Sequence, residues 1–150
     1  MNEFSTENMK ALTILLAEDN EDHAELIIES LRDFNVGNEV IHVADGQALI
    51  DYLAELRDAP DRLPDLILLD LKMPRLDGKG ALRIIKEDEV YRTIPVLVVT
   101  TSGNQVEIEE CYKFGANSYI TKPLKFDDFH RKIRDLNLYW VITSELPSRE

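Results

Sequence analysis

Hydrophobic residues follow two alternating patterns along this chain. Short apolar runs, which predict strands, occupy residues 12–17, 40–43, 66–69, 96–99 and 119–121. After each run, apolar residues recur at intervals of three or four, the period of an amphipathic helix. The run at 66–69 contains no polar residue, which is typical of a strand buried on both faces of a parallel sheet. The pattern predicts five βα units in a doubly wound α/β fold with a parallel sheet.

The predicted helices have recognisable ends and buried faces. Residues that favour helix ends are Glu18-Asp19-Asn20, Gly37, Asp45-Gly46, Asp77-Gly78, Gly115 as a C′ residue, and Asp127-Asp128. The apolar residues of the five helices are, in order, Ala24, Ile27, Ile28, Leu31 and Phe34; Leu49, Tyr52, Leu53 and Leu56; Ala81, Leu82 and Ile85; Val106, Ile108, Cys111 and Tyr112; and Phe126, Phe129, Ile133, Leu136 and Trp140. Polar residues flank the run at 40–43, which predicts a strand at or near the sheet edge.

Composition narrows the classes of protein that this chain can belong to. Its 150 residues, 44% of them hydrophobic, suffice for one buried domain, which we place at 12–142 between polar tails at 1–11 and 143–150. A net charge of −12 argues against a nucleic-acid partner. No signal peptide or membrane span is apparent, so we expect a cytoplasmic protein without a membrane partner. The residues around Cys111 have no metal-ligand spacing, so we expect this cysteine to be a packed thiol in a reducing compartment.

Polar residues follow four of the predicted strands. Glu18 and Asp19 end the first, Asp70 the third, Thr100 the fourth and Lys122 the fifth. The carboxyl ends of parallel strands meet at one edge, where open α/β sheets bind ligands. Three carboxylates about 5 Å apart repel by a few kcal/mol unless a cation joins them, and carboxylate oxygens suit Mg²⁺ and an accompanying phosphate. A carboxylate is also an accepted nucleophile for phosphoryl groups.

Each of these residues also has a simpler interpretation. Asp70 or Glu18-Asp19-Asn20 could cap a helix, Thr100 could end a strand, and Lys122-Pro123 could form a surface turn. Each such explanation accounts for one residue or motif alone, whereas a common site accounts for all of them. The set of residues therefore favours a phosphate and Mg²⁺ site.

Several motifs resemble, in order, those of the receiver domain of two-component response regulators. They are Glu18-Asp19 after the first strand, Leu-Leu-Asp70 with Met73-Pro74, Asp77-Gly78, Val-Val-Thr100, and Tyr119-Ile-Thr-Lys122-Pro123. The resemblance covers nearly the whole chain. It implies a flavodoxin-like fold with strand order 2-1-3-4-5 and five helices, in a signalling protein that is not an enzyme.

The resemblance also implies a role for each site residue. Asp70 would accept a phosphoryl group from a sensor histidine kinase and become an aspartyl phosphate. Glu18, Asp19 and Asp70 would hold Mg²⁺ with the main-chain carbonyl of Lys72, Thr100 and Lys122 would contact the phosphoryl oxygens, and Thr100 and Tyr119 would form the switch. A cis peptide at Lys122–Pro123 is usual in the family. Lys72 and Ser102 occupy positions that tune phosphoryl lifetime, which is left open.

The chain also resembles a narrower group, the single-domain regulators that partner phytochrome-type sensor kinases. This resemblance lies in the lengthened segment before the third strand and in the ending Leu-Tyr-Trp-Val-Ile-Thr-Ser-Glu-Leu-Pro. Without a domain after the last helix, the output is expected to be contact with a downstream protein that the sequence does not identify.

The last predicted helix carries more apolar residues than one core can use. Leu138, Tyr139, Val141 and Ile142 lie off its main stripe, and an exposed patch of this kind is more often an interaction site than an accident. We expect a two-fold homodimer through these residues. The alternative is that the chain bends back after Asn137 and packs them on its own domain.

Three other classes of protein have features in common with this chain. A haloacid-dehalogenase-like phosphatase needs a second Asp where this chain has Lys72, and a dinucleotide-binding module needs glycines where Glu18 and Asp19 stand. Both are excluded. A receiver-like binding module that acts without phosphorylation remains the alternative.

Overall fold

The sheet has five parallel strands in the order β2-β1-β3-β4-β5. The computed structural model describes residues 11–34, 37–122, 128, 131 and 135. Its strands are β1 (Thr13–Ala17), β2 (Glu39–Val43), β3 (Leu66–Leu69), β4 (Val96–Thr100) and β5 (Ser118–Thr121). Each begins and ends within one residue of the predicted run, and β2 lies at the sheet edge as predicted. The strand order and the flavodoxin-like fold are confirmed.

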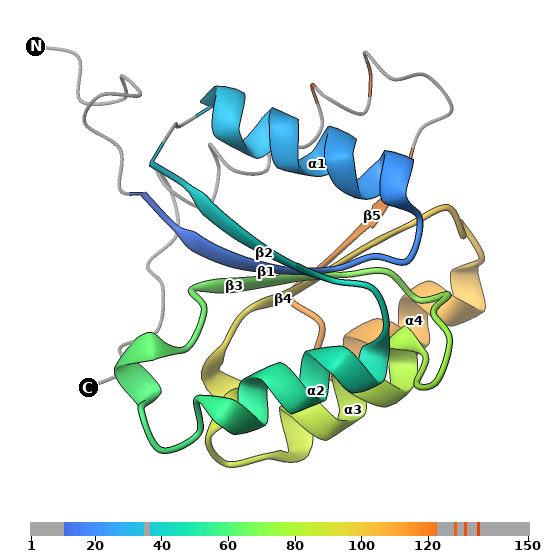
Figure 1. The fold of residues 1–150 in the computed structure, drawn as a ribbon. Coiled ribbons are helices and arrows are strands. Elements are labelled where there is room, and N and C mark those ends of the chain that lie inside the picture. The colour runs from blue at the N-terminus through green and yellow to red at the C-terminus, as the bar shows by residue number, and fades with distance from the viewer. Residues whose placement is uncertain (1–10, 35–36, 123–127, 129–130, 132–134, 136–150) are drawn as a thin grey trace, which may run out of the picture.

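Four helices cover the sheet within the described ranges. They are α1 (Glu21–Phe34), α2 (Gly46–Glu55), α3 (Gly78–Glu87) and α4 (Gln105–Lys113), with 3₁₀ turns at η2 (Pro60–Arg62) and η3 (Tyr91–Thr93). Figure 1 shows α1 on one face and α2, α3 and α4 on the other. Most of the predicted fifth helix lies outside the described residues. The structure describes Asp128, Arg131 and Asp135 of this segment, and each has helical backbone.

The strands bury side chains on both faces, as their apolar runs predict. In β1, Ile14 and Leu16 belong to the core under α1, whereas Leu15 and Ala17 belong to the core under α2–α4. This alternation follows from the two-residue period of a strand. The strands thereby hold two separate cores together, and their carboxyl ends are fixed from both sides.

Side chains cap the N-termini of all four described helices, which fixes where the loops after the strands end. At α1, Asn20 Oδ1 accepts from His23 N at 3.0 Å. Asp45 Oδ1 accepts from Ala48 N at 2.7 Å and Asp77 Oδ1 accepts from Gly80 N at 2.8 Å. Asn104 Oδ1 caps α4 in the same way. At the other end of α4, Gly115 has a φ of 105°, the left-handed conformation expected of the predicted C′ residue.

Helix α4 is more exposed than its apolar residues suggest. Cys111 is fully buried, but Val106 and Tyr112 are 62% and 49% exposed. At about 100° per residue, Val106 lies about 140° around the helix from Cys111 and Tyr112 about 100° from it. One helix face therefore cannot bury all three, and α4 presents apolar groups to solvent.

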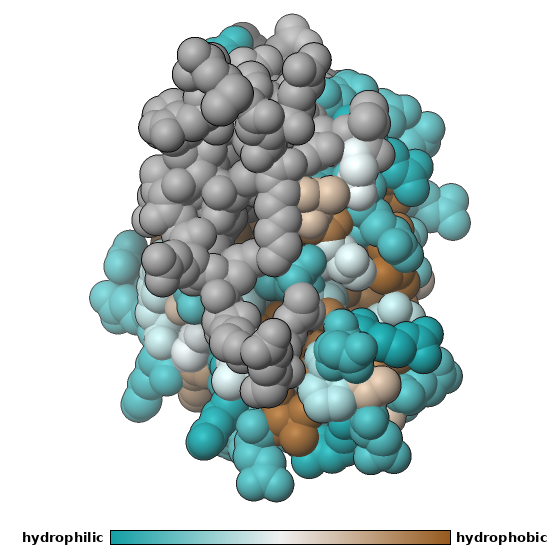
Figure 2. All heavy atoms as spheres, turned by 90° about the vertical axis from the view of Figure 1, so that its left-hand side faces the viewer, coloured by the Kyte–Doolittle hydropathy of each residue, from teal (hydrophilic) through white to brown (hydrophobic). Residues whose placement is uncertain are grey.

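Among the described residues, those at the molecular face of the amino ends of the strands form a mainly hydrophilic surface (Figure 2). Figure 2 views the molecule from this side, where hydrophobic side chains appear only in small separate areas among the coloured atoms. Within the described ranges, no helix has both the length and the apolar character needed to cross a membrane. The polar groups that concentrate charge lie at the opposite, carboxyl edge.

Candidate functional site

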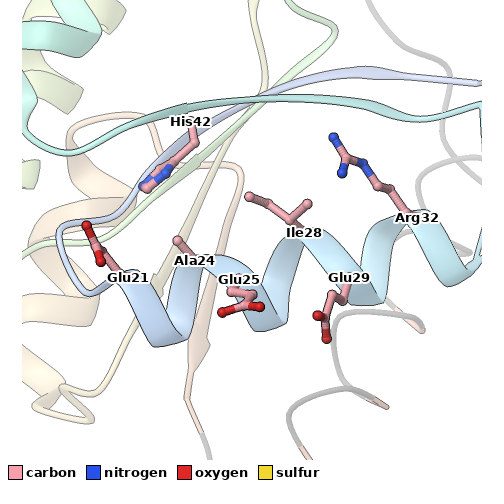
Figure 3. Close-up of a pocket in the computed structure, with 7 residues that line it drawn as sticks. All are labelled: Glu21, Ala24, Glu25, Ile28, Glu29, Arg32 and His42. Atoms are coloured by element: carbon pink, nitrogen blue, oxygen red, sulfur yellow. The ribbon is translucent and has the colours of Figure 1, made fainter.

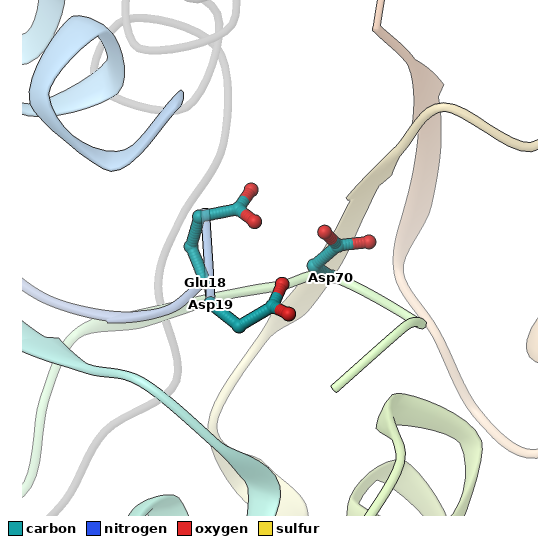
Figure 4. A group of neighbouring side chains, drawn as sticks. All are labelled: Glu18, Asp19 and Asp70. Carbon is teal, nitrogen blue, oxygen red and sulfur yellow. The ribbon is translucent and has the colours of Figure 1, made fainter. Parts of the chain in front are cut away.

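Three carboxylates converge at the carboxyl edge of the sheet. Asp70 N donates to Ala17 O at 3.0 Å and Glu18 N donates to Val43 O at 3.1 Å, so backbone pairing continues past the strand ends. The first bond holds the ends of β3 and β1 side by side, and the second holds those of β1 and β2. One oxygen each of Glu18, Asp19 and Asp70 lies within 4.8 Å of the others. Figure 4 shows the three side chains directed toward a common space.

Lys122 brings a buried cation to the same place. Its backbone N donates to Thr100 O at 2.7 Å, which ties the end of β5 to the end of β4. Its ammonium donates to Glu18 Oε1 and to Asp70 Oδ2, the latter at 3.3 Å, and its side chain is 2% exposed. The residues singled out from the sequence are thus brought together, with the ammonium between two carboxylates.

In the described part of the chain, Thr100 carries the buried side-chain oxygen that makes no hydrogen bond of ordinary geometry, although its hydroxyl lies near enough to Asp70 to help lower the pKa of that carboxyl. An unsatisfied buried hydroxyl costs about 1–3 kcal/mol. Thr100 is fully buried, so bulk solvent does not reach it. A hydroxyl in this position at the site edge is available to a ligand with an acceptor oxygen, such as a phosphoryl group.

Burial and hydrogen bonding shift the pKa values of Glu18 and Asp70 in opposite directions. Burial, together with the neighbouring Asp70, raises the pKa of Glu18 to about 7. Burial also acts to raise the pKa of Asp70, but its hydrogen bond with Glu18 and the charge of Lys122 outweigh this and lower it. Two adjacent carboxyls cannot both ionise freely without a cation. Ionisation of Asp70 is therefore favoured over ionisation of Glu18.

The donor set fits Mg²⁺. Carboxylate oxygens are the hard ligands that this ion takes, usually with several waters and a phosphate. Two oxygens on one Mg²⁺ lie up to about 4.2 Å apart, which is close to the spread of the three carboxylates here. Burial and the neighbouring Asp70 raise the pKa of Glu18, and a bound cation would favour its ionised form. Glu18, Asp19 and Asp70 therefore form a candidate metal centre.

The loop after β3 is held firmly against the site. Gly78 N donates to Leu71 O at 2.9 Å, and a Cβ on Gly78 would lie 2.2 Å from Asp70 O, so only glycine fits there. Arg75, with a φ of 66°, donates to both carboxylate oxygens of Asp45 at 2.9 and 3.0 Å. Within this loop, Lys72 N lies 3.4 Å from Asp70 Oδ1. The metal contact of the Lys72 carbonyl stays a prediction.

Tyr119 lies on β5 in the register position opposite Val98. Its hydroxyl donates to Ser102 O at 2.7 Å, and its backbone N donates to the Tyr112 hydroxyl at 3.1 Å. The ring is half-buried against the core under α2–α4. Tyr119 therefore links β5 to both ends of α4, and its role as a switch with Thr100 stays a prediction.

Two histidines at the site were missed from the sequence. His42 Nε2 donates to Glu18 O at 2.7 Å and so braces the end of β1 from the edge strand. His23 Nδ1 lies 3.0 Å from Lys122 Nζ. Their positions in the sequence could have identified them. His23 stands in the first turn of the helix that follows Asp19, and His42 stands one residue before the end of β2.

A shallow groove of about 420 Å³ lies between α1 and β2, and no residue of the carboxylate cluster lines it. Figure 3 shows its lining, in which His42 comes from β2 and the remaining residues from α1: Glu21, Ala24, Glu25, Ile28, Glu29 and Arg32. The groove is open and its carboxylates come from a single helix. It does not present the converging acid, base and cation that the sheet edge provides.

The predicted dimer residues Leu138, Tyr139, Val141 and Ile142 lie outside the described residues, as does Pro123 with its peptide bond to Lys122. The homodimer and the cis peptide therefore stay predictions.

Known proteins resemble this chain over most of its length. The probable methanogenesis regulatory protein FilR2 of Methanothrix harundinacea is 38% identical, over 85% of this chain and 83% of that protein. The response regulator Rcp1 of Synechocystis sp. is 33% identical over 96% of this chain and 99% of Rcp1. The Mn²⁺-bound crystal structure of Rcp1 matches with a TM-score of 0.82, over 91% of this chain and 99% of the Rcp1 chain.

The crystal structure of the phosphorylated cyanobacterial phytochrome response regulator RcpA gives a TM-score of 0.85. RcpA is 36% identical, over 93% of this chain and all of the RcpA chain. Residues 14–134 match the family model of the response regulator receiver domain. This match spans the sheet, the four helices and every residue of the carboxylate cluster, and the chain therefore belongs to the response regulator receiver domain family.

Proposed function

We propose that this protein is a single-domain response regulator, with a receiver domain at 12–142, that accepts a phosphoryl group on Asp70 from a sensor histidine kinase in the cytoplasm. The observation that carries the proposal is the surroundings of Asp70. Its carboxylate contacts the Lys122 ammonium, lies within 4.8 Å of Glu18 and Asp19 oxygens, and shares its sheet edge with the partnerless hydroxyl of Thr100. These groups correspond to a nucleophile, a cation site and two phosphoryl contacts.

The transfer would use these groups as follows. A carboxylate oxygen of Asp70 forms the new P–O bond to the phosphorus of a phosphohistidine, the P–N bond breaks, and the imidazole leaves and takes up a proton. The Lys122 ammonium neutralises charge on the phosphoryl oxygens, and the Thr100 hydroxyl donates a hydrogen bond to one of them. Mg²⁺ bound by Glu18, Asp19, Asp70 and the Lys72 carbonyl would supply further positive charge to the same oxygens.

The output would be a change in a protein-binding surface, since the domain is a signalling module and not an enzyme. If the Thr100 hydroxyl turns toward the phosphoryl group, it vacates space into which the Tyr119 ring can rotate. That rotation would break the 2.7 Å hydrogen bond from Tyr119 to Ser102 O, at the start of the α4 segment. The exposed Val106 and Tyr112 of α4 would then face a downstream protein in a new arrangement.

A phytochrome-type sensor kinase is the proposed donor, because the similarity to the phytochrome response regulator RcpA extends over 93% of this chain. We also propose a two-fold homodimer through Leu138, Tyr139, Val141 and Ile142, which rests on the sequence alone. Sedimentation of the unmodified and beryllofluoride-treated protein tests the dimer. A variant with Tyr139→Glu and Ile142→Glu should be monomeric, and monomers at tens of micromolar in every sample would refute the dimer.

The central test is phosphorylation by a small donor. The protein is incubated with Mg²⁺ and acetyl phosphate, and its intact mass is measured. One phosphoryl group should add to the wild type and to Asp77→Asn, a change at the exposed α3 cap in the same loop. None should add to Asp70→Asn. A single persistent addition to Asp70→Asn would exclude Asp70 as the acceptor, and no addition to the wild type would favour the receiver-like module that acts without phosphorylation.

A further inference from the structure

His23 is a third partner of the Lys122 ammonium. The three N–H groups of this ammonium face Glu18 Oε1, Asp70 Oδ2 at 3.3 Å and His23 Nδ1 at 3.0 Å. An ammonium can donate hydrogen bonds but cannot accept them, so Nδ1 must be the unprotonated ring nitrogen and the proton of the neutral imidazole lies on Nε2. The contact therefore fixes both the tautomer of His23 and the direction of one N–H of Lys122.

The chain holds His23 firmly in this position. Its backbone N donates to Asn20 Oδ1 at 3.0 Å, the cap of α1, and Asn20 N donates to Glu18 Oε2 at 3.2 Å. The turn from β1 into α1 is thus tied to the same glutamate that contacts Lys122. Burial and the charge of Lys122 lower the pKa of His23, which keeps the imidazole neutral and able to accept.

The three acceptors around the ammonium differ in charge and in availability. Glu18 and Asp70 are carboxylates that the proposed function assigns to the metal ion and the phosphoryl group, so both change partners during the reaction. The imidazole of His23 is neutral and has neither role. A neutral acceptor orients the ammonium without cancelling the positive charge that the phosphoryl oxygens require.

We propose that His23 is a positioning residue for phosphoryl transfer, which holds the Lys122 ammonium beside Asp70 through Nδ1 while the carboxylates bind other groups. This inference rests on the proposed function. Loss of the Nδ1 acceptor leaves one buried N–H of Lys122 without a partner and lets the ammonium turn toward Glu18. Misplacement of a group that stabilises transferred charge slows the reaction by a factor of ten or more, by order of magnitude.

Three substitutions separate the acceptor atom from the rest of the side chain. In His23→Asn, the amide oxygen stands the same number of bonds from the backbone as Nδ1, whereas in His23→Gln it stands one bond further out. His23→Leu removes the acceptor. Glu25→Leu, at an exposed position of the same helix, is the matched control. The rate of mass gain is measured over a series of acetyl phosphate concentrations, with Mg²⁺ saturating.

We expect His23→Leu and His23→Gln to lower the maximal rate about tenfold, which is the effect of one lost hydrogen bond to a charged group. His23→Asn should stay within about threefold of the wild type, and Glu25→Leu should match it. Thermal melting of each variant checks folding. The ¹⁵N spectrum of the wild-type histidines gives an independent readout, in which His23 should have a protonated Nε2 and an unprotonated Nδ1.

The outcomes distinguish this inference from the proposed function. A wild type that gains no phosphoryl group overturns the proposed function and the inference with it. A normal wild type with an unimpaired His23→Leu overturns the inference alone. Equal losses in His23→Asn, His23→Gln and His23→Leu also overturn it, because the position of the acceptor atom would then be irrelevant. The same conclusion follows if His23 Nδ1 carries the proton.

Discussion

The interior of the sheet and its carboxyl edge bury different kinds of side chain. Ile67, Leu68 and Val98 lie within three residues of the edge and are fully buried apolar residues whose backbone groups pair along the strands. Immediately beyond the strand ends, the buried residues are Asp70, Glu18 and Lys122. Buried apolar groups stabilise the fold, whereas buried charges cost free energy even when paired. The interior therefore accounts for stability, and the edge keeps costly groups that only binding explains.

The largest effect should come from the interior. Leu68→Ala removes a fully buried side chain from the core under α1, and we expect the free energy of unfolding to fall by about 2–5 kcal/mol. Urea denaturation measures this. Ile84→Ala on α3, where Ile84 is 42% exposed, should change stability by about 0.5 kcal/mol or less. Equal losses in the two variants would contradict the distinction between a tight interior and a tolerant surface.

Mg²⁺ should offset the free-energy cost of the three carboxylates at the carboxyl edge and so stabilise the folded protein. A divalent ion that joins the three carboxylates stabilises the folded protein by mass action, by about 2.7 kcal/mol at a concentration one hundred times its Kd. Thermal or urea denaturation with and without Mg²⁺ measures the gain. Asp19→Asn should reduce the gain while Asp22→Asn, at an exposed position outside the cluster, should keep it. Identical gains in both variants would place the ion elsewhere.

Thr100→Val should replace a buried polar group at the carboxyl edge with an apolar one, as in the interior of the sheet. The substitution replaces the partnerless hydroxyl with a methyl group of similar shape, so the metal-free protein should gain about 1 kcal/mol in free energy of unfolding. The same variant should take up the phosphoryl group more slowly than the wild type. Thr101→Val, the exposed neighbour, is the control and should change neither property. A destabilised Thr100→Val would mean that the hydroxyl has a partner after all.

The edge should also give stability a pH dependence. The folded pKa of Glu18, about 7, lies above its ordinary value of 4.5, so between these values the folded protein holds a proton that the unfolded chain has released. Stability from this group is therefore present below pH 4.5 and is lost as the pH rises through 7, by on the order of 1 kcal/mol. The lowered pKa of Asp70 has the opposite sign, and its contribution is lost only as the pH falls below 3.8.

Urea unfolding of the metal-free protein between pH 5 and pH 8 measures this dependence against Glu18→Gln. The difference in stability between the two proteins should change across that range. Parallel curves would show that Glu18 does not titrate there.

The strands and the site edge could be predicted from sequence because both follow from local patterns. The apolar runs locate the strands to within one residue, and parallel strands place the residues after them together. The three partners of the Lys122 ammonium could not be predicted, because they depend on side-chain directions set by segments up to 104 residues apart. His23 was not predicted as a site residue for the same reason.

The exposure of apolar side chains on α4 could also not be predicted from the sequence pattern. Four apolar residues suggest a buried stripe, but the buried face of a helix is decided by the sheet it packs on, and here it accommodates Cys111 and leaves Val106 and Tyr112 in solvent. Sequence periodicity thus located the helix and not its orientation.

The central claim is that the buried charges at the carboxyl edge form an incomplete binding site for a cation and a phosphoryl group. A crystal structure with Mg²⁺ and beryllofluoride, which mimics the phosphoryl group on a carboxylate, tests this most directly. We predict Mg²⁺ on Glu18, Asp19 and Asp70, the beryllofluoride on Asp70, and its fluorine atoms in contact with the Thr100 hydroxyl and the Lys122 ammonium. An ion bound elsewhere, or a Thr100 hydroxyl still without a partner, would contradict the account.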